Sequence, residues 1–163
     1  TDELRRDPYS KHAIFGYNMI KEKSLDIRIK QAVLTHHERL DESGFPLKIA
    51  KNQISQFSRL IAIADVYDIL TMKEEGIETL SPFDALKEFE SNGHHKFDSH
   101  MLITFTSKIA NTFVQHMVRL NNGEQGRIIL INKYNLSRPL VQIGSSFIDL
   151  AIRNDLYIKE MLD

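Results

Sequence analysis

The segment from Ser55 to Met72 is the most apolar part of the chain and the strongest constraint on its fold. Apolar side chains occupy most of its positions, so a helix over these residues would leave little polar surface. A helix of this kind is buried by its neighbours, which predicts a mainly α fold built around a central buried helix. No apolar run approaches the roughly 18 residues of a membrane span, so no membrane segment is expected.

Helical patterns flank this segment on both sides. Before it, we expect a helix around His12 and a second helix that is capped by Asp26 and runs into residues 36–38. After it, one helix begins at Ser81 and ends at Asn92-Gly93, and another carries an apolar stripe. The stripe consists of Leu102, Phe105, Ile109, Phe113 and Met117.

The pattern changes in the last quarter of the chain. Short β-like runs at residues 126–132 and 138–144 predict a small hairpin, and residues 149–161 predict a short terminal helix. We therefore expect a partial helical bundle over residues 1–119 and a small C-terminal extension with short strands over residues 120–163.

Charge and cysteine content narrow the possible functions. The 163 residues include 21 basic and 22 acidic side chains, which gives no reason to expect binding to a nucleic-acid polymer. Without cysteine, thiolate metal sites and disulfides are excluded, and a metal would need histidine, carboxylate and water ligands. The chain starts at Thr1 and has no signal-like N-terminus, so we expect part of a longer cytoplasmic protein.

The strongest chemical signal is the pair His36-His37, which is followed by Glu38 and by a turn that contains Asp41 and Gly44. Neighbouring residues on a helix point about 100° apart. The two imidazoles can therefore bind two adjacent metals, or one can bind a metal and the other a substrate oxygen. Histidine pairs are also common at protein surfaces, so the pair alone leaves both interpretations open.

A carboxylate inside the most apolar segment strengthens the metal interpretation. A buried Asp65 without a partner would destabilise the fold or lose its charge. A cation is one suitable partner, and a buried arginine or a hydrogen bond at a helix end is the alternative. Arg59 is available, but it lies off the same helical face. The chain thus offers four candidate metal ligands from three helices: His12, His36, His37 and Asp65.

Three motifs, which follow one another along the chain in the order of the family's pattern, resemble the HD-GYP family of metal-dependent phosphohydrolases. Residues 36–46, HHERLDESGFP, are similar to its HHE…DGSGYP signature, and residues 59–68, RLIAIADVYD, resemble its RIIAIADVYDAL helix. Residues 12–16, HAIFG, resemble its HPxxG helix. The resemblance covers roughly residues 6–105. It implies an all-helical fold, iron or manganese at a dinuclear or trinuclear centre, and hydrolysis of cyclic di-GMP or a related cyclic dinucleotide.

The resemblance also implies roles for individual residues. It assigns metal binding to His12, His36, His37 and Asp65. It places the loop Gly44-Phe45-Pro46 at the mouth of the substrate pocket, and Lys73 near the position of a phosphate-binding residue. No catalytic residue is assigned. The implied partners are a cyclic dinucleotide and an upstream sensory or regulatory domain.

The chain departs from the family pattern at three places. It has no HDxGK segment, which in the family bridges the metals, so alone it is expected to bind one metal at best and to be inactive. Glu74 and Glu75 follow Lys73 and would repel a phosphate, and Glu42 replaces a glycine of the signature loop. Two interpretations follow: the downstream part of an active enzyme, or a degenerate, non-catalytic module for regulation or homodimer formation.

Overall fold

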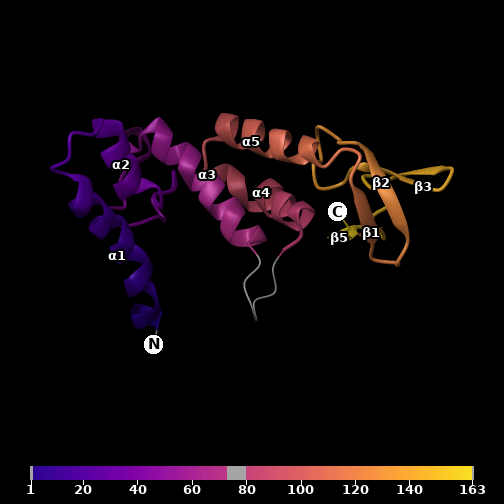
Figure 1. The fold of residues 1–163 in the computed structure, drawn as a ribbon, viewed down its shortest axis with the longest axis horizontal. Helices are drawn as coiled ribbons and strands as arrows, with labels where there is room; N and C mark the ends of the chain where they lie inside the picture. The colour runs from indigo at the N-terminus through magenta and orange to yellow at the C-terminus, as the bar shows by residue number, and fades with distance from the viewer. Residues whose placement is uncertain (1, 73–79, 163) are drawn as a thin grey trace. The chain divides into compact units, whose positions relative to one another are not determined.

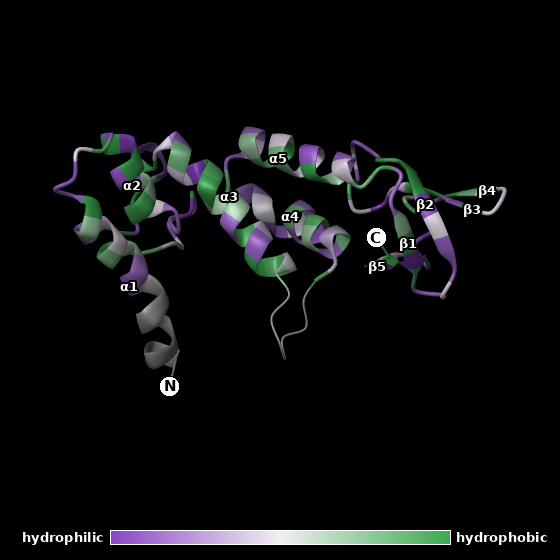
Figure 2. Ribbon diagram, in the orientation of Figure 1, coloured by the Kyte–Doolittle hydropathy of each residue, from purple (hydrophilic) through white to green (hydrophobic). Residues whose placement is uncertain are grey.

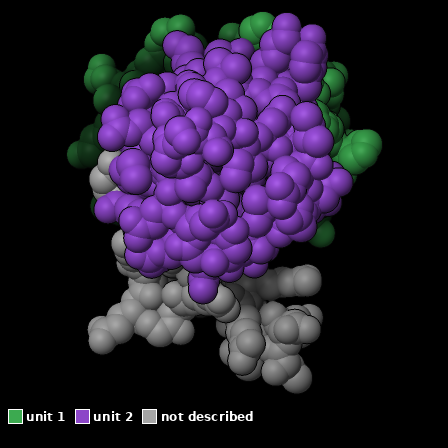
Figure 3. Space-filling view, turned by 90° about the vertical axis from the view of Figure 1, so that its right-hand side faces the viewer, with its two compact units in different colours: residues 1–66, 93–102 green, residues 67–92, 103–163 purple. Residues whose placement is uncertain are grey.

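The computed structural model describes residues 2–72 and 80–162, with side chains from residue 11 onward (Figure 1). The chain divides into two compact units (Figure 3). They are residues 1–66 with 93–102, called unit 1, and residues 67–92 with 103–163, called unit 2.

Two packed helices begin unit 1. α1 (Asp2–Ile20) lies against α2 (Ile27–Thr35), and Ala13 of α1 is fully buried. The helices approach closely at Gly16, where a Cβ atom would lie 3.0 Å from Cγ1 of Val33. A glycine at this position therefore sets how near His12, one turn earlier on α1, comes to the end of α2.

The predicted cap of the second helix is present. Asp26 begins α2, and its side chain accepts a hydrogen bond from the backbone N–H of Arg28. The loop after α2 contains a short 3₁₀ helix, η1 (Lys51–Gln53), and a cis peptide bond between Phe45 and Pro46.

The helix predicted over residues 55–72 is present as α3 (Gln56–Thr71), and hydrophobic residues are distributed along it (Figure 2). It is not buried on all sides, because its buried residues are Ser58, Ala62 and Ile63. The side chains exposed by more than 40% include Phe57, Leu60, Ile61 and Ile69. The expectation of a central buried helix is therefore wrong: only one face of α3 is covered.

Two more helices follow the described part of α3. α4 (Pro82–Lys96) passes the predicted end at Asn92-Gly93, so that His94 and His95 lie exposed in its last turn instead of in a loop. α5 (Ser99–Thr112) begins after Asp98, whose carboxylate accepts the backbone N–H of Met101.

The C-terminal part of the chain is a five-stranded antiparallel sheet, with strand order β4-β3-β2-β1-β5 (Figure 2). The strands are β1 (Met117–Leu120), β2 (Gln125–Leu130), β3 (Leu140–Ile143), β4 (Ser146–Asp149) and β5 (Ile158–Met161). The helical prediction for the preceding residues is confirmed, and the predicted hairpin is present as β2 and β3, which pair antiparallel. The extension is larger than the expected small hairpin, because three further strands join this pair. The predicted terminal helix over residues 149–161 is also wrong. The predicted boundary at residue 120 stays a prediction.

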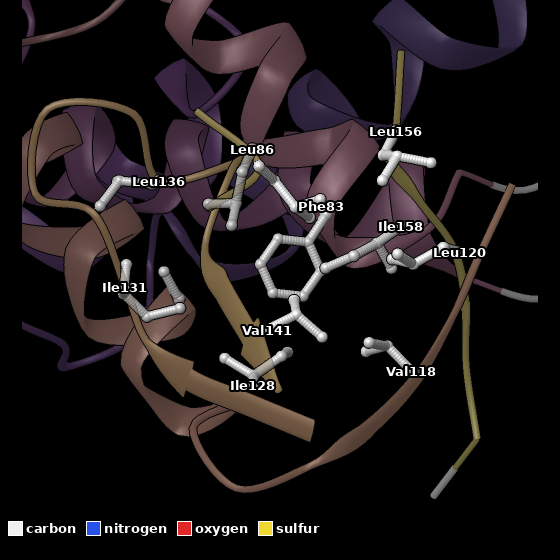
Figure 4. Packing of buried hydrophobic residues seen from close by; sticks show 12 residues of the cluster. Phe83, Leu86, Val118, Leu120, Ile128, Ile131, Leu136, Val141, Leu156 and Ile158 are labelled. Carbon is white, nitrogen blue, oxygen red and sulfur yellow. The ribbon is translucent and has the colours of Figure 1, made fainter. Parts of the chain in front are cut away.

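A single hydrophobic core joins α4 to the sheet within unit 2 (Figure 4). Phe83 and Leu86 of α4 are buried together with Val118, Ile128 and Val141 from three neighbouring strands. Each fully buried side chain of this size contributes about 1.5–3 kcal/mol relative to an exposed one. The sheet therefore belongs to the folded core of unit 2 rather than being an appendage.

Candidate metal centre

His36 stands at the C-terminal end of α2, where its ring is fixed by the helix backbone. Its Nδ1 atom lies 2.9 Å from the carbonyl oxygen of Val33 and 3.2 Å from that of Ala32. A carbonyl oxygen only accepts, so Nδ1 carries the proton and donates it. The lone pair of His36 is therefore on Nε2, the atom that points toward α1.

His37 is the most buried of the candidate ligands, with 6% of its surface exposed. Burial above all, together with the nearby His36, His12 and Arg39, lowers its pKa to about 3. The imidazole is therefore neutral at physiological pH, as a metal ligand must be. Its Nδ1 atom lies 3.3 Å from Oδ2 of Asp65, which leaves Nε2 facing the other histidines.

The three imidazoles converge on one point in unit 1. Nε2 of His12 lies 2.9 Å from Nε2 of His37 and 3.3 Å from Nε2 of His36. Nitrogen ligands about 2.1 Å from one ion lie about 3.0 Å apart at right angles and about 3.4 Å apart in a tetrahedron. Both distances from His12 therefore fit ligands of a single metal ion. The three histidines form the candidate ligand group among the described residues, with one ligand atom of each within 4.8 Å of the others.

Asp65 lies beside this group and not within it. Its Oδ2 atom is buried and makes no hydrogen bond with the described residues, in spite of its 3.3 Å approach to His37. A buried carboxylate oxygen without a donor fits a site that receives a cation. The alternative partner for Asp65, a buried arginine, is not Arg59, because Arg59 pairs with Asp98 at 3.2 Å.

A pair of buried hydroxyl groups joins the helices that carry the site. Thr35, the last residue of α2, has its Oγ1 atom 2.7 Å from Oγ of Ser58 on α3. Both residues are buried, so this hydrogen bond fixes the end of α2 against the helix that carries Asp65. This contact was not predicted from the sequence, where Ser58, a small polar residue among the apolar positions of α3, was the available signal.

The loop Gly44-Phe45-Pro46 lies directly against the ligand pair. The ring of Phe45 is stacked on the ring of His37, with centroids 4.5 Å apart and planes at 30°. The backbone N–H of Phe45 donates to the carbonyl oxygen of His37. Lys73, the predicted phosphate contact, lies outside the described residues.

An open apolar groove of about 550 Å³ adjoins the histidines on the side of His36. It runs between α2 and α3, and its apolar lining is Ile29, Ala32, Val33, Phe57 and Ile61. The guanidinium of Arg28 lies over the ring of Phe57, 5.5 Å from its centroid. The candidate metal group thus has a hydrophobic surface next to it in unit 1.

The family of the chain follows from comparison with known sequences. The family described as HD domain matches residues 2–101, which include all the candidate ligands. The chain belongs to the HD domain family. This membership confirms the resemblance that the three motifs indicated, and the HD domain family is metal-dependent.

Named relatives agree with this assignment. A cyclic di-GMP phosphodiesterase of Pseudomonas aeruginosa is 29% identical over 142 residues, which cover 86% of this chain and 33% of that protein. A cyclic di-GMP phosphodiesterase of Borreliella burgdorferi is 24% identical over 80% of this chain and 35% of its own length. A 3'3'-cGAMP-specific phosphodiesterase of Vibrio cholerae is 30% identical over 60% of this chain and 21% of its own length.

The chain therefore spans about a third of the length of the first two relatives. Among the described residues, no helix has the length and apolarity needed to cross a bilayer.

Proposed function

We propose that this HD domain supplies one side of the metal centre of a cyclic-dinucleotide phosphodiesterase. The observation that carries the proposal is the approach of Nε2 of His12 to Nε2 of both His36 and His37, at the spacing of ligands around one ion. The names of the relatives support the substrate class, since they act on cyclic di-GMP or 3'3'-cGAMP.

Each of the candidate ligands has its own proposed role in binding the ion. His36 and His37 present Nε2 because their Nδ1 atoms face backbone carbonyls and Asp65, respectively. Asp65 contributes negative charge beside His37 and is proposed as a fourth ligand through its carboxylate. A set of nitrogen and oxygen donors without thiolates suits iron or manganese. Such an ion would supply Lewis acidity and a water of lowered pKa for attack on phosphorus.

The substrate would lie beside the histidines. We propose that Gly44, Phe45 and Pro46 line the mouth of the site, since Phe45 already covers one face of His37. Lys73 remains the proposed contact for a phosphate, and an upstream regulatory domain remains a proposed partner.

Metal analysis and hydrolysis assays of the natural full-length protein test this proposal. We expect bound iron or manganese and hydrolysis of cyclic di-GMP or 3'3'-cGAMP, both lost in His36→Ala. The matched control is His94→Ala, because His94 is exposed in the last turn of α4 and lies outside the ligand group. A wild-type protein that binds neither metal would contradict the proposal.

A second function, a non-catalytic module for regulation or dimerisation, is favoured by the apolar groove in unit 1. Ile29, Phe57 and Ile61 line it and are 42–51% exposed. Surfaces of this kind are commonly covered by a partner. We propose that a second copy of the chain covers it in this case, and light scattering that shows only monomer would count against this function.

A further inference from the structure

We propose that Glu38 is a positioning residue, which holds the loop from Gly44 to Lys48 (the 44–48 loop) against His37 and so fixes that ligand for the ion. The inference rests on the proposed metal centre and deepens it. Its subject is a carboxylate that lies next to the histidine pair in sequence but takes no part in the group of three Nε2 atoms.

Glu38 is bound on one side only. It is 2% exposed, and its Oε1 atom accepts the backbone N–H groups of Leu47 at 2.6 Å and Lys48 at 3.0 Å. Its Oε2 atom is buried and has no hydrogen-bond partner among the described residues. A half-satisfied buried carboxylate is costly for stability. The two hydrogen bonds to Oε1 fix the end of the 44–48 loop at Leu47 and Lys48.

The other end of the same loop, at Gly44, packs against the backbone of residues 37–39. A Cβ atom on Gly44 would lie 2.4 Å from the carbonyl oxygen of His37, 2.5 Å from Cα of Glu38 and 2.6 Å from N of Arg39. The absence of a side chain is therefore what allows the loop to lie flush against these residues.

Between these two anchors, Phe45 is pressed onto the face of His37. The imidazole then has Asp65 near its Nδ1 atom and Phe45 stacked on its ring face. Glu38 touches neither ring, so it acts through the position of the loop. Removing an outer partner of a metal ligand typically lowers metal affinity by about 10–100-fold.

The experiment compares Glu38→Ala with Glu38→Gln. Alanine removes the acceptor for both amides, so we expect Mn²⁺ to bind at least about tenfold more weakly. Glutamine keeps one acceptor oxygen, so we expect an affinity close to that of the wild type. In the metal-free protein, NMR of the His37 ring nitrogens should report a changed environment in Glu38→Ala and not in Glu38→Gln.

Glu90 provides a matched control. Its carboxylate, on α4 in unit 2, accepts from the backbone N–H of Leu136 and from Oγ of Ser137, the latter at 2.6 Å. Glu90→Ala therefore removes a carboxylate that binds a loop in the same manner, but in the unit that does not carry the histidine group. It should lower stability without changing the His37 ring signals or the affinity for Mn²⁺.

The outcomes separate the two proposals. If Glu38→Ala does not fold, Phe45→Leu replaces it, and Phe45→Tyr is the conservative variant expected to keep the His37 signals and the Mn²⁺ affinity of the wild type. Unchanged His37 signals and unchanged Mn²⁺ affinity in these variants would overturn the positioning role. A wild-type protein that binds no Mn²⁺, but whose His37 signals still move in Glu38→Ala, would contradict only the metal centre.

Discussion

Replacing Gly44 by alanine should damage both the fold of unit 1 and the metal centre. The new Cβ atom would lie 2.4–2.6 Å from three backbone atoms of residues 37–39, where contacts below 3.0 Å do not persist. The backbone on one side must move by several tenths of an ångström or more. Overpacking of this kind costs about 1–3 kcal/mol, and we expect the upper end because every clashing atom is backbone.

A loss of about 3 kcal/mol lowers the melting temperature of a chain of this size by about 6–12 °C. Thermal unfolding followed by circular dichroism measures this change. Gly16→Ala is the control, because its Cβ atom would meet only a side-chain atom of Val33, at 3.0 Å, and alanine favours a helix by about 1 kcal/mol over glycine. Equal melting temperatures for the two variants would refute the close seating of the 44–48 loop.

Two further predictions concern single residues of unit 1. Glu42 has a positive φ of 62° and is exposed, so Glu42→Gly should raise the free energy of unfolding by up to about 1 kcal/mol, as measured by urea titration. Glu42→Ala should give no such gain, and an equal gain from alanine would exclude backbone strain. The hydrogen bond from the backbone N–H of Met101, and then Arg59, lower the pKa of Asp98 below its ordinary value of 3.8. The ionised carboxylate therefore stabilises the fold fully at pH values above 3.8, and this stabilisation disappears as the pH falls through the lowered pKa. Asp98→Ala should therefore cost about 1 kcal/mol at pH 7 and progressively less in acid, and a difference that does not depend on pH would contradict this.

The arrangement of the histidines could largely be predicted from the sequence. His36-His37 after an apolar helix and His12 one turn before Gly16 indicated ligands from two packed helices, and α1 and α2 are packed in this way. What the sequence did not show was the support beneath them. Glu38 and its contacts with the 44–48 loop depend on residues nine and ten positions away, and no local pattern records them.

The sheet was underestimated because its strands are short and its contacts are distant. Met117 continued the apolar stripe of α5 in the sequence, but Gln115 takes a positive φ of 76° and donates its N–H to Ile128, which starts the sheet instead.

The terminal helix predicted over residues 149–161 failed for a related reason. Arg138 donates to the carbonyl oxygens of Leu150 and Leu156, which would otherwise be available to a helix. Asp149 accepts the N–H of Ala151 and favours a turn. A long-range arginine contact of this kind outweighs local helix preference and cannot be seen in a local pattern.

Titration of the metal-free protein with Mn²⁺ tests the metal centre most directly, with binding followed by isothermal calorimetry. The convergence of the Nε2 atoms of His12, His36 and His37 predicts one ion per histidine group. His37→Ala should abolish this binding, and His94→Ala should leave it unchanged. Absence of binding in the wild type, or equal binding in His37→Ala, would contradict the assignment of these three histidines as a metal site.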